Sequence, residues 1–209
     1  MVMTPPDDSI LYTPKGATPI EPDDLPYLLL PLSNRGELNA VEQANIFNAK
    51  IVAMASRKMK QNLLSIDALT ELHQWMFSDV WKWAGKFRTR VTNIGVDPHQ
   101  ICDQIAALVS NTKYQMEHKT YSLEEVAVRF HHRMVKIHLF PNGNGRHSRL
   151  VADLLMFYNG KPEFNWGGES IDVEGTTRDR YLAALGKADG NKYDDLMEFA
   201  LDSGRTRNG

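Results

Sequence analysis

The segment 138–149 gathers residues that could bind phosphate and move a proton. It reads His-Leu-Phe-Pro-Asn-Gly-Asn-Gly-Arg-His-Ser-Arg. Gly143 and Gly145 can adopt positive φ at no steric cost, so successive backbone N–H groups can turn inward around an anion. A helix predicted directly after them would add the unpaired N–H donors and the partial positive charge of its N-terminus. The pattern is typical of a phosphate-binding loop.

Charged and titratable side chains extend this interpretation. Arg146 and Arg149 lie three residues apart, on one face of the predicted helix, and both can form forked hydrogen bonds to phosphate oxygens. A polyphosphate chain is therefore the predicted ligand. His138 stands just before the loop, where a neutral imidazole could take a proton from an incoming hydroxyl. Taken singly, a histidine beside an aromatic residue is more often structural and Asn-Gly pairs are more often ordinary turns; their combination favours a functional site.

The segment closely resembles the signature of the Fic domain, His-x-Phe-x-(Asp/Glu)-Gly-Asn-Gly-Arg-x-x-Arg. The resemblance implies a mainly α fold, a helical bundle with a short β-hairpin called the flap. It also implies a nucleotidyltransferase, a protein adenylyltransferase that moves AMP from ATP to a hydroxyl side chain of a target protein. His138 would be the catalytic base. Nucleotide binding would fall to six residues: Asn142, Gly143, Asn144, Gly145, Arg146 and Arg149.

Asn142 departs from the signature, which has Asp or Glu there to hold Mg²⁺ between the nucleotide phosphates. An amide oxygen can bind a hard cation but adds no charge, so the affinity for Mg²⁺ or Mn²⁺ should be weaker. Two further hypotheses therefore stay open. The chain could be a nucleotide-binding regulatory module that transfers nothing, or an interaction protein of mobile genetic cassettes that displays its proline-rich arm. Transfer of another phosphate-bearing group is also open.

A second short pattern begins at Ser33 and includes Glu37 and Leu38. It resembles the Fic inhibitory motif, (Ser/Thr)-x-x-x-Glu-(Gly/Asn), with Leu38 in place of the last residue. In the family that glutamate pairs with the second signature arginine, here Arg149, and blocks productive binding of the γ-phosphate. The resemblance implies a self-inhibited chain. The alternative is that Glu37 only stabilises the dipole of a helix that begins there.

Composition narrows the functional classes. The chain has 209 residues, 42% of them hydrophobic, which suffices for one substantial core. A net charge of -2 provides no field for nucleic acid or an anionic membrane. The longest apolar run, residues 27–32, is far shorter than the roughly 20 residues of a membrane span, and no signal peptide is recognised. With Cys102 as the single cysteine, a reducing cytoplasm is the expected location.

The pattern along the chain predicts a proline-rich arm over 1–36, a Fic domain with an N-terminal inhibitory helix over 37–203, and a flexible tail over 204–209. Alternating β-branched residues predict the hairpin at 83–96. In the family it holds a segment of the target protein as an added strand, whereas the alternative is a structural hairpin that seals the bundle. The target protein is the expected partner, and an oligomer is left open. Apolar spacing predicts helices that begin near these residues: Leu38, Ser65, Pro98, Ser122, Arg146, Tyr181 and Leu196.

Overall fold

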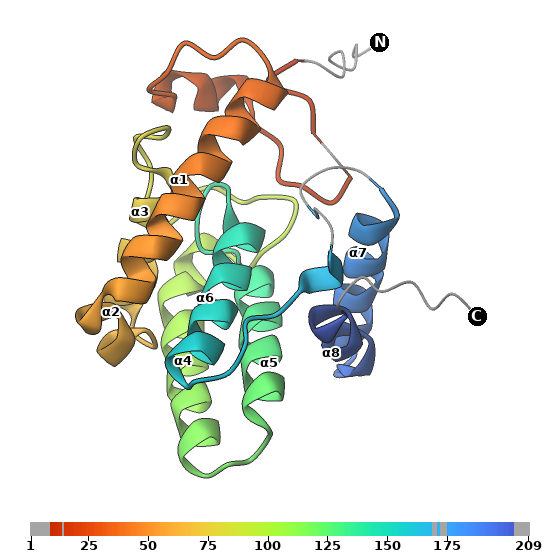
Figure 1. Ribbon diagram of the computed structural model, residues 1–209. Coiled ribbons are helices and arrows are strands. Elements are labelled where there is room, and N and C mark those ends of the chain that lie inside the picture. The colour runs from red at the N-terminus through yellow and green to blue at the C-terminus, as the bar shows by residue number, and fades with distance from the viewer. Residues whose placement is uncertain (1–8, 14, 169–170, 172–174, 203–209) are drawn as a thin grey trace.

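The computed structural model describes residues 9–13, 15–168, 171 and 175–202, so the predicted tail 204–209 lies outside it. The described chain is mainly helical, as predicted (Figure 1). Its helices are α1 (Arg35–Ala55), α2 (Arg57–Asn62), α3 (Ile66–Phe77), α4 (Ile101–Glu117), α5 (Leu123–Ile137), α6 (Asn144–Tyr158), α7 (Thr176–Asp189) and α8 (Asp194–Leu201). Short 3₁₀ turns are η1 (Pro22–Tyr27), η2 (Pro98–Gln100) and η3 (Trp166–Gly168). None of these helices combines the length and the apolar character needed to cross a membrane.

The helices α5 and α6 form the centre of the bundle (Figure 1). α4 and α8 also pack against α5, α1 packs against α3 and α6, and α7 pairs with α8. The apolar spacing predicts a buried stripe on α5 that consists of Leu123, Val126, Phe130, Met134 and Ile137. The last four are each at most 2% exposed, and Leu123 is half-buried against the core. The 3.6-residue period of the helix turns these side chains to the core. The end of α5 is thereby fixed, and the chain leaves it directly into His138.

Two predicted helix starts are capped by serine. Ser65 Oγ accepts the backbone N–H of Ala68 at 3.1 Å, and Ser122 Oγ accepts that of Glu125 at 3.1 Å. Each bond satisfies one of the unpaired donors of a first helical turn. The carboxylate of Glu125 accepts the Arg129 Nε–H at 2.9 Å, one turn further along the helix.

The hairpin predicted at 83–96 is not confirmed, because the described residues of this segment form turns and irregular chain. The buried Arg88 guanidinium donates to the carbonyls of Val96 and His138, and the Arg88 N–H donates to Leu139 O at 2.9 Å. The guanidinium also donates to the Arg90 carbonyl at 2.9 Å, so one side chain takes up two carbonyls of the predicted hairpin, those of Arg90 and Val96. Residues 87–96, named here the flap loop, are fastened to the signature segment by these bonds.

The proline-rich arm runs irregularly through its described residues to the start of α1, apart from η1. In Figure 1 it passes over the end of the bundle where the signature segment leads into α6. Ile10, Leu11, Leu28 and Leu30 pack against the core, as predicted for a docked arm. The division of the chain at residues 36 and 203 stays a prediction.

A carboxyl group on α6 should make stability depend on pH. Asp153 is largely buried and accepts the Trp166 Nε1–H at 2.9 Å. Burial raises its pKa from 3.8 to about 7. Between those values the unfolded chain releases this proton while the folded chain keeps it, so the free energy of unfolding falls as pH rises from about 4 to about 7. We expect Asp153→Asn, which stays neutral, to be more stable than wild type at pH 8 by about 2–4 kcal/mol.

Urea unfolding at pH 5 and pH 8 measures this effect. The exposed Asp103 provides the control, because Asp103→Asn should leave the difference between the two pH values unchanged. An Asp153→Asn chain that lost as much stability as wild type between pH 5 and pH 8 would show that another group titrates.

Candidate active site

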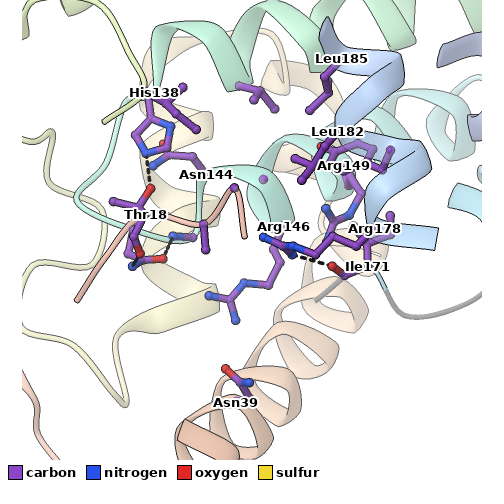
Figure 2. A pocket seen from close by; sticks show the side chains of 18 of the residues that line it. Thr18, Asn39, His138, Asn144, Arg146, Arg149, Ile171, Arg178, Leu182 and Leu185 are labelled. Atoms are coloured by element: carbon purple, nitrogen blue, oxygen red, sulfur yellow. Dashed lines mark hydrogen bonds between the residues drawn. The ribbon is translucent and has the colours of Figure 1, made fainter. Parts of the chain in front are cut away.

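The signature segment lines a pocket between the end of α5, the start of α6, α1, α7 and the arm (Figure 2). All seven residues predicted for catalysis and nucleotide binding line it, namely His138, Asn142, Gly143, Asn144, Gly145, Arg146 and Arg149. They come together because two consecutive helices place the short segment between them. The structure therefore brings all seven predicted residues together in one pocket, although their side chains make different contacts.

His138 ends α5 in a left-handed conformation, with φ 57° and ψ 68°. Such a backbone is uncommon for a residue other than glycine and is found preferentially at functional sites. The side chain is 5% exposed, and burial together with the nearby Arg88 cation lowers its pKa to about 4. The imidazole is therefore neutral at physiological pH. Its Nε2 lies 2.8 Å from the hydroxyl oxygen of Thr18.

The two glycines of the loop differ in conformation. Gly143 has φ +77° and caps α6, as the predicted anion-binding turn requires. A Cβ atom there would lie 2.5 Å from Cζ of Phe77. Gly145 lies in the first turn of α6 without a positive φ, so its predicted left-handed conformation is wrong. The helix begins earlier than the pattern predicted, at Asn144, and this brings Gly145 inside it.

Two amide side chains brace the loop. Asn144 is buried, and its amide pairs with both the N–H and the carbonyl of Phe140, at 2.9 and 2.8 Å. Asn142 Oδ1 accepts the Gly143 N–H at 2.7 Å, and Asn142 Nδ2 donates to the Thr18 carbonyl at 3.3 Å. The Asn144 side chain therefore holds backbone, which leaves its N–H at the helix start to face an anion.

A buried histidine supports the loop from behind. His73 lies on α3 and stacks on the Phe140 ring, with 3.6 Å between ring centroids. Its two nitrogens contact the Asn142 carbonyl at 3.2 Å and the Gly85 N–H at 3.0 Å. Burial holds the pKa of His73 well below its usual value, so the ring is neutral. Sequence reasoning missed this support, since His73 is far from the signature in the chain.

Among the described residues that line the pocket, four carry a guanidinium group, namely Arg35, Arg146, Arg149 and Arg178. The sequence predicted two of them. The Nε and Nη1 atoms of Arg35 are buried and have no hydrogen-bond partner among the described atoms. Burial lowers the pKa of Arg35, Glu42 raises it, and the neighbouring Arg146 and Arg178 cations lower it further. Buried donors left unpaired among like charges indicate a site for an anion.

The predicted inhibitory pair takes a different arrangement. Glu37 is exposed, and its carboxylate accepts the Ser33 N–H at 2.8 Å. Its own N–H donates to Asn34 Oδ1 at 2.9 Å, so the described geometry is that of a capped helix start. The Arg149 guanidinium lies over the Tyr181 ring, 5.6 Å from its centroid.

Another acid on α1 does reach a signature arginine. Glu42 is 2% exposed and pairs with Arg146 Nη1 at 2.6 Å, while its second oxygen accepts the Trp81 Nε1–H at 2.6 Å. This ion pair fixes the direction of Arg146. Sequence reasoning missed Glu42 because it lies at an ordinary helical position outside any motif. The burial that distinguishes Glu42 from other helical acids is created by residues distant in the chain.

The pocket offers little to a divalent cation. Among its described lining residues none is Asp or Glu, and the described part of the chain holds no group of three or more His, Cys, Asp or Glu that could bind a metal. Asn142 could supply one amide oxygen, which already accepts the Gly143 N–H. Mg²⁺ prefers carboxylate and phosphate oxygens in a full octahedron. The protein's own donors therefore do not fit a resident Mg²⁺ ion.

Placing a carboxylate at position 142 tests whether this residue contacts the metal. We expect Asn142→Asp to raise the Mg²⁺ affinity of the ATP-loaded protein several-fold, because a charged oxygen would lie beside the phosphates. Titration of Mg²⁺ at saturating ATP, followed by calorimetry, measures it. Asn39→Asp is the matched control, since it adds the same charge to the same pocket from α1 (Figure 2). Superimposable curves for Asn142→Asp and wild type would show that residue 142 never touches the metal.

Comparisons with known proteins agree with this geometry. Residues 63–156 match the sequence model of the Fic/DOC family. Protein adenylyltransferase fic-1 of Caenorhabditis briggsae is 31% identical over 127 residues, which are 58% of this chain and 24% of the relative. Its counterpart in Caenorhabditis elegans is 29% identical, over 58% of this chain and 23% of the relative. The chain thus spans about a quarter of the length of these curated relatives.

Solved structures share the fold. The BepC protein of Bartonella tribocorum, solved with bound AMPPNP, superposes with a TM-score of 0.65 at 16% identity, over 91% of this chain and 93% of that one. A fragment of Fic-1 from C. elegans gives a TM-score of 0.61 at 23% identity, over 83% of this chain and 50% of that one. Residues 63–156 therefore match the Fic/DOC family, the signature loop of the pocket lies inside that range, and the described chain has the fold of these solved structures.

Proposed function

We propose that the protein transfers AMP from ATP to a hydroxyl side chain of a protein. The observation that carries this proposal is the hydroxyl oxygen 2.8 Å from Nε2 of a buried, neutral His138. That nitrogen can take the hydroxyl proton, and the anion-binding side of the pocket lies next to it. The curated relatives are named protein adenylyltransferases, which supports the same activity.

The reaction would proceed in line. An acceptor hydroxyl at His138 gives its proton to Nε2 as its oxygen attacks the α-phosphorus of ATP, and pyrophosphate leaves. The Gly143 turn and the start of α6 hold the phosphate chain, while Arg146 and Arg149 balance the charge of its β and γ groups. Mg²⁺ or Mn²⁺, the predicted cofactor, would arrive in complex with ATP. Catalysis would rest on positioning and electrostatics.

The second candidate is a nucleotide-binding module that transfers nothing, and the neutral Asn142 favours it. The two candidates separate when the protein is incubated with a cell lysate and ATP labelled at either the α- or the γ-phosphate. AMP transfer places α-label but no γ-label on protein. Bound nucleotide without transfer supports the module, and γ-label on protein would indicate phosphoryl transfer. Absence of nucleotide binding would leave only the interaction protein.

The target protein is proposed to bind along the flap loop. The exposed Val91 and Asn93 lie on this loop, and its other side is fastened to the signature segment. A target segment lying there would bring its hydroxyl toward His138. A cytoplasmic location, and the absence of nucleic acid and membrane as partners, stay predictions from composition.

Self-inhibition by Glu37 is also proposed, from the resemblance. It requires the carboxylate to exchange the Ser33 N–H for the guanidinium of Arg149. Loss of one charge-assisted hydrogen bond, about 1.5 kcal/mol, changes the equilibrium between the inhibited and the open form roughly tenfold. Glu37→Gly should therefore label protein about ten times faster than wild type. The gain should vanish in Glu37→Gly/Arg149→Ala. Equal rates for wild type and Glu37→Gly would leave Glu37 as a first-turn residue of α1 whose carboxylate accepts the Ser33 N–H.

A further inference from the structure

The N-terminal arm is held across the mouth of the pocket. Residues 15–18 are tied to α7, where Arg178 Nε donates to the Lys15 carbonyl at 2.7 Å. On the opposite side, the flap loop holds them through Asn93 Nδ2, which donates to the Ala17 carbonyl at 3.1 Å. These bonds anchor the backbone on both sides. The segment therefore occupies the place that the proposed function assigns to an acceptor protein.

One side chain of this segment points at the catalytic histidine. Thr18 is 8% exposed, and its Oγ1 lies 2.8 Å from His138 Nε2, as the dashed line in Figure 2 marks. In the neutral ring with its proton on Nδ1, Nε2 accepts the hydroxyl hydrogen. The Thr18 carbonyl is held by Asn142 Nδ2 at 3.3 Å, so both the backbone and the side chain of this residue are fixed.

The rest of the pocket is arranged so that a nucleotide donor could lie next to the Thr18 hydroxyl. Figure 2 shows Thr18 and His138 together at one side, and Arg146, Arg149 and Arg178 gathered at the other, with the start of α6 between them. A triphosphate along these cations would present its α-phosphorus at the end nearest the hydroxyl. Among the described residues of the pocket lining, the other hydroxyl is that of Tyr181, which contacts His131 Nε2 at 3.1 Å instead.

We propose that Thr18 is an acceptor in cis, and that the chain adenylylates itself there. The inference rests on the proposed function. His138 Nε2 takes the proton of the Thr18 hydroxyl, and Oγ1 forms a bond to the α-phosphorus of ATP. The bond between that phosphorus and the oxygen bridging to the β-phosphate breaks, pyrophosphate leaves, and a phosphodiester joins AMP to Thr18. Because one hydroxyl is held in each pocket, labelling should stop at one AMP per chain.

Mass spectrometry of the intact chain tests the site. After incubation with ATP and Mg²⁺, we expect one added AMP, located on Thr18 in the tryptic peptide 16–35, which also contains Tyr27 and Ser33. Thr18→Val removes the hydroxyl at nearly constant volume and should abolish the modification. Thr18→Ser keeps the hydroxyl and should retain it. Thr13 lies on the same arm with its hydroxyl on the Leu11 carbonyl, so Thr13→Val should be labelled like wild type.

A mixing experiment tests the cis arrangement. A His138→Ala chain keeps Thr18 but lacks the base, and a Thr18→Val chain keeps the base but lacks the acceptor. Mixed with ATP, they should leave Thr18 of the His138→Ala chain unmodified. The fraction of wild-type chains that become labelled per unit time should not change over a tenfold range of protein concentration. Label on the His138→Ala chain would overturn transfer in cis.

A lysate included in a parallel reaction separates this inference from the proposed function. Labelled lysate proteins, or AMP on another residue of the chain, with Thr18 unmodified, would overturn the inference and leave the function standing. Faster labelling of lysate proteins by Thr18→Val, again with Thr18 unmodified in wild type, would show that the arm only covers the pocket. No label on any protein would overturn both.

Discussion

His138→Ala should lower the rate of AMP transfer by about 10²–10⁴-fold, the usual contribution of a positioned general base. ATP affinity should stay within a few-fold of wild type, because the imidazole contacts the Thr18 hydroxyl, whereas the residues proposed to hold the phosphates lie elsewhere in the pocket. The fall should appear in kcat, with little change in KM for ATP. Label transfer from α-labelled ATP and calorimetric titration of ATP measure the two quantities.

The exposed His99 provides the control, since His99→Ala should transfer AMP like wild type. The pH profile adds an independent check. With a His138 pKa of about 4, wild-type transfer should keep this base active well below pH 6.5, where an ordinary histidine becomes protonated. A His138→Ala chain that kept its rate would remove the histidine from the chemistry.

Gly143→Ala should destabilise the fold by about 2–5 kcal/mol. About 1–2 kcal/mol comes from a left-handed residue that carries a Cβ, and about 1–3 kcal/mol from overpacking against Phe77, whose Cζ would lie 2.5 Å away. For a chain of this size, each kcal/mol lowers Tm by about 2–4 °C. ATP affinity should fall as well, because the loop can no longer turn its N–H groups inward.

Gly145→Ala is the matched control two residues away. It lies inside α6, and its nearest neighbour to an added Cβ is Arg149 Nη1 at 3.7 Å. We expect its free energy of unfolding to change by no more than about 1 kcal/mol, with a gain favoured by helix propensity. Equal losses in the two variants would place the left-handed turn elsewhere. Thermal unfolding of both proteins decides between these outcomes.

The helices and the signature loop could be predicted because their causes are local. Apolar spacing, serine caps and the order of residues 138–149 act within a few positions along the chain. The buried stripe of α5 and the caps Ser65 and Ser122 are confirmed. The start of α1 was placed three residues late, since the Asn34 cap lies in a segment that the pattern treated as arm.

Contacts between distant segments could not be predicted. The sequence favoured a hairpin at 83–96, yet one buried side chain, Arg88, takes the Arg90 and Val96 carbonyls of that segment. It selected Glu37 from a short motif, whereas the acid that reaches a signature arginine is Glu42. Arg35, at a variable position of that short motif, also enters the pocket. Each of these depends on burial, which only the assembled bundle creates.

The tie between the arm and α7 has a consequence for the order of assembly. During synthesis Lys15 leaves the ribosome before its partner Arg178, which is made more than 150 residues later. The central helices can pack before that point, because their contacts are closer in sequence. The pocket therefore closes only after α7 has emerged. A growing chain cut short before α7 would hold a finished signature loop and an arm tied to the flap loop but not to α7.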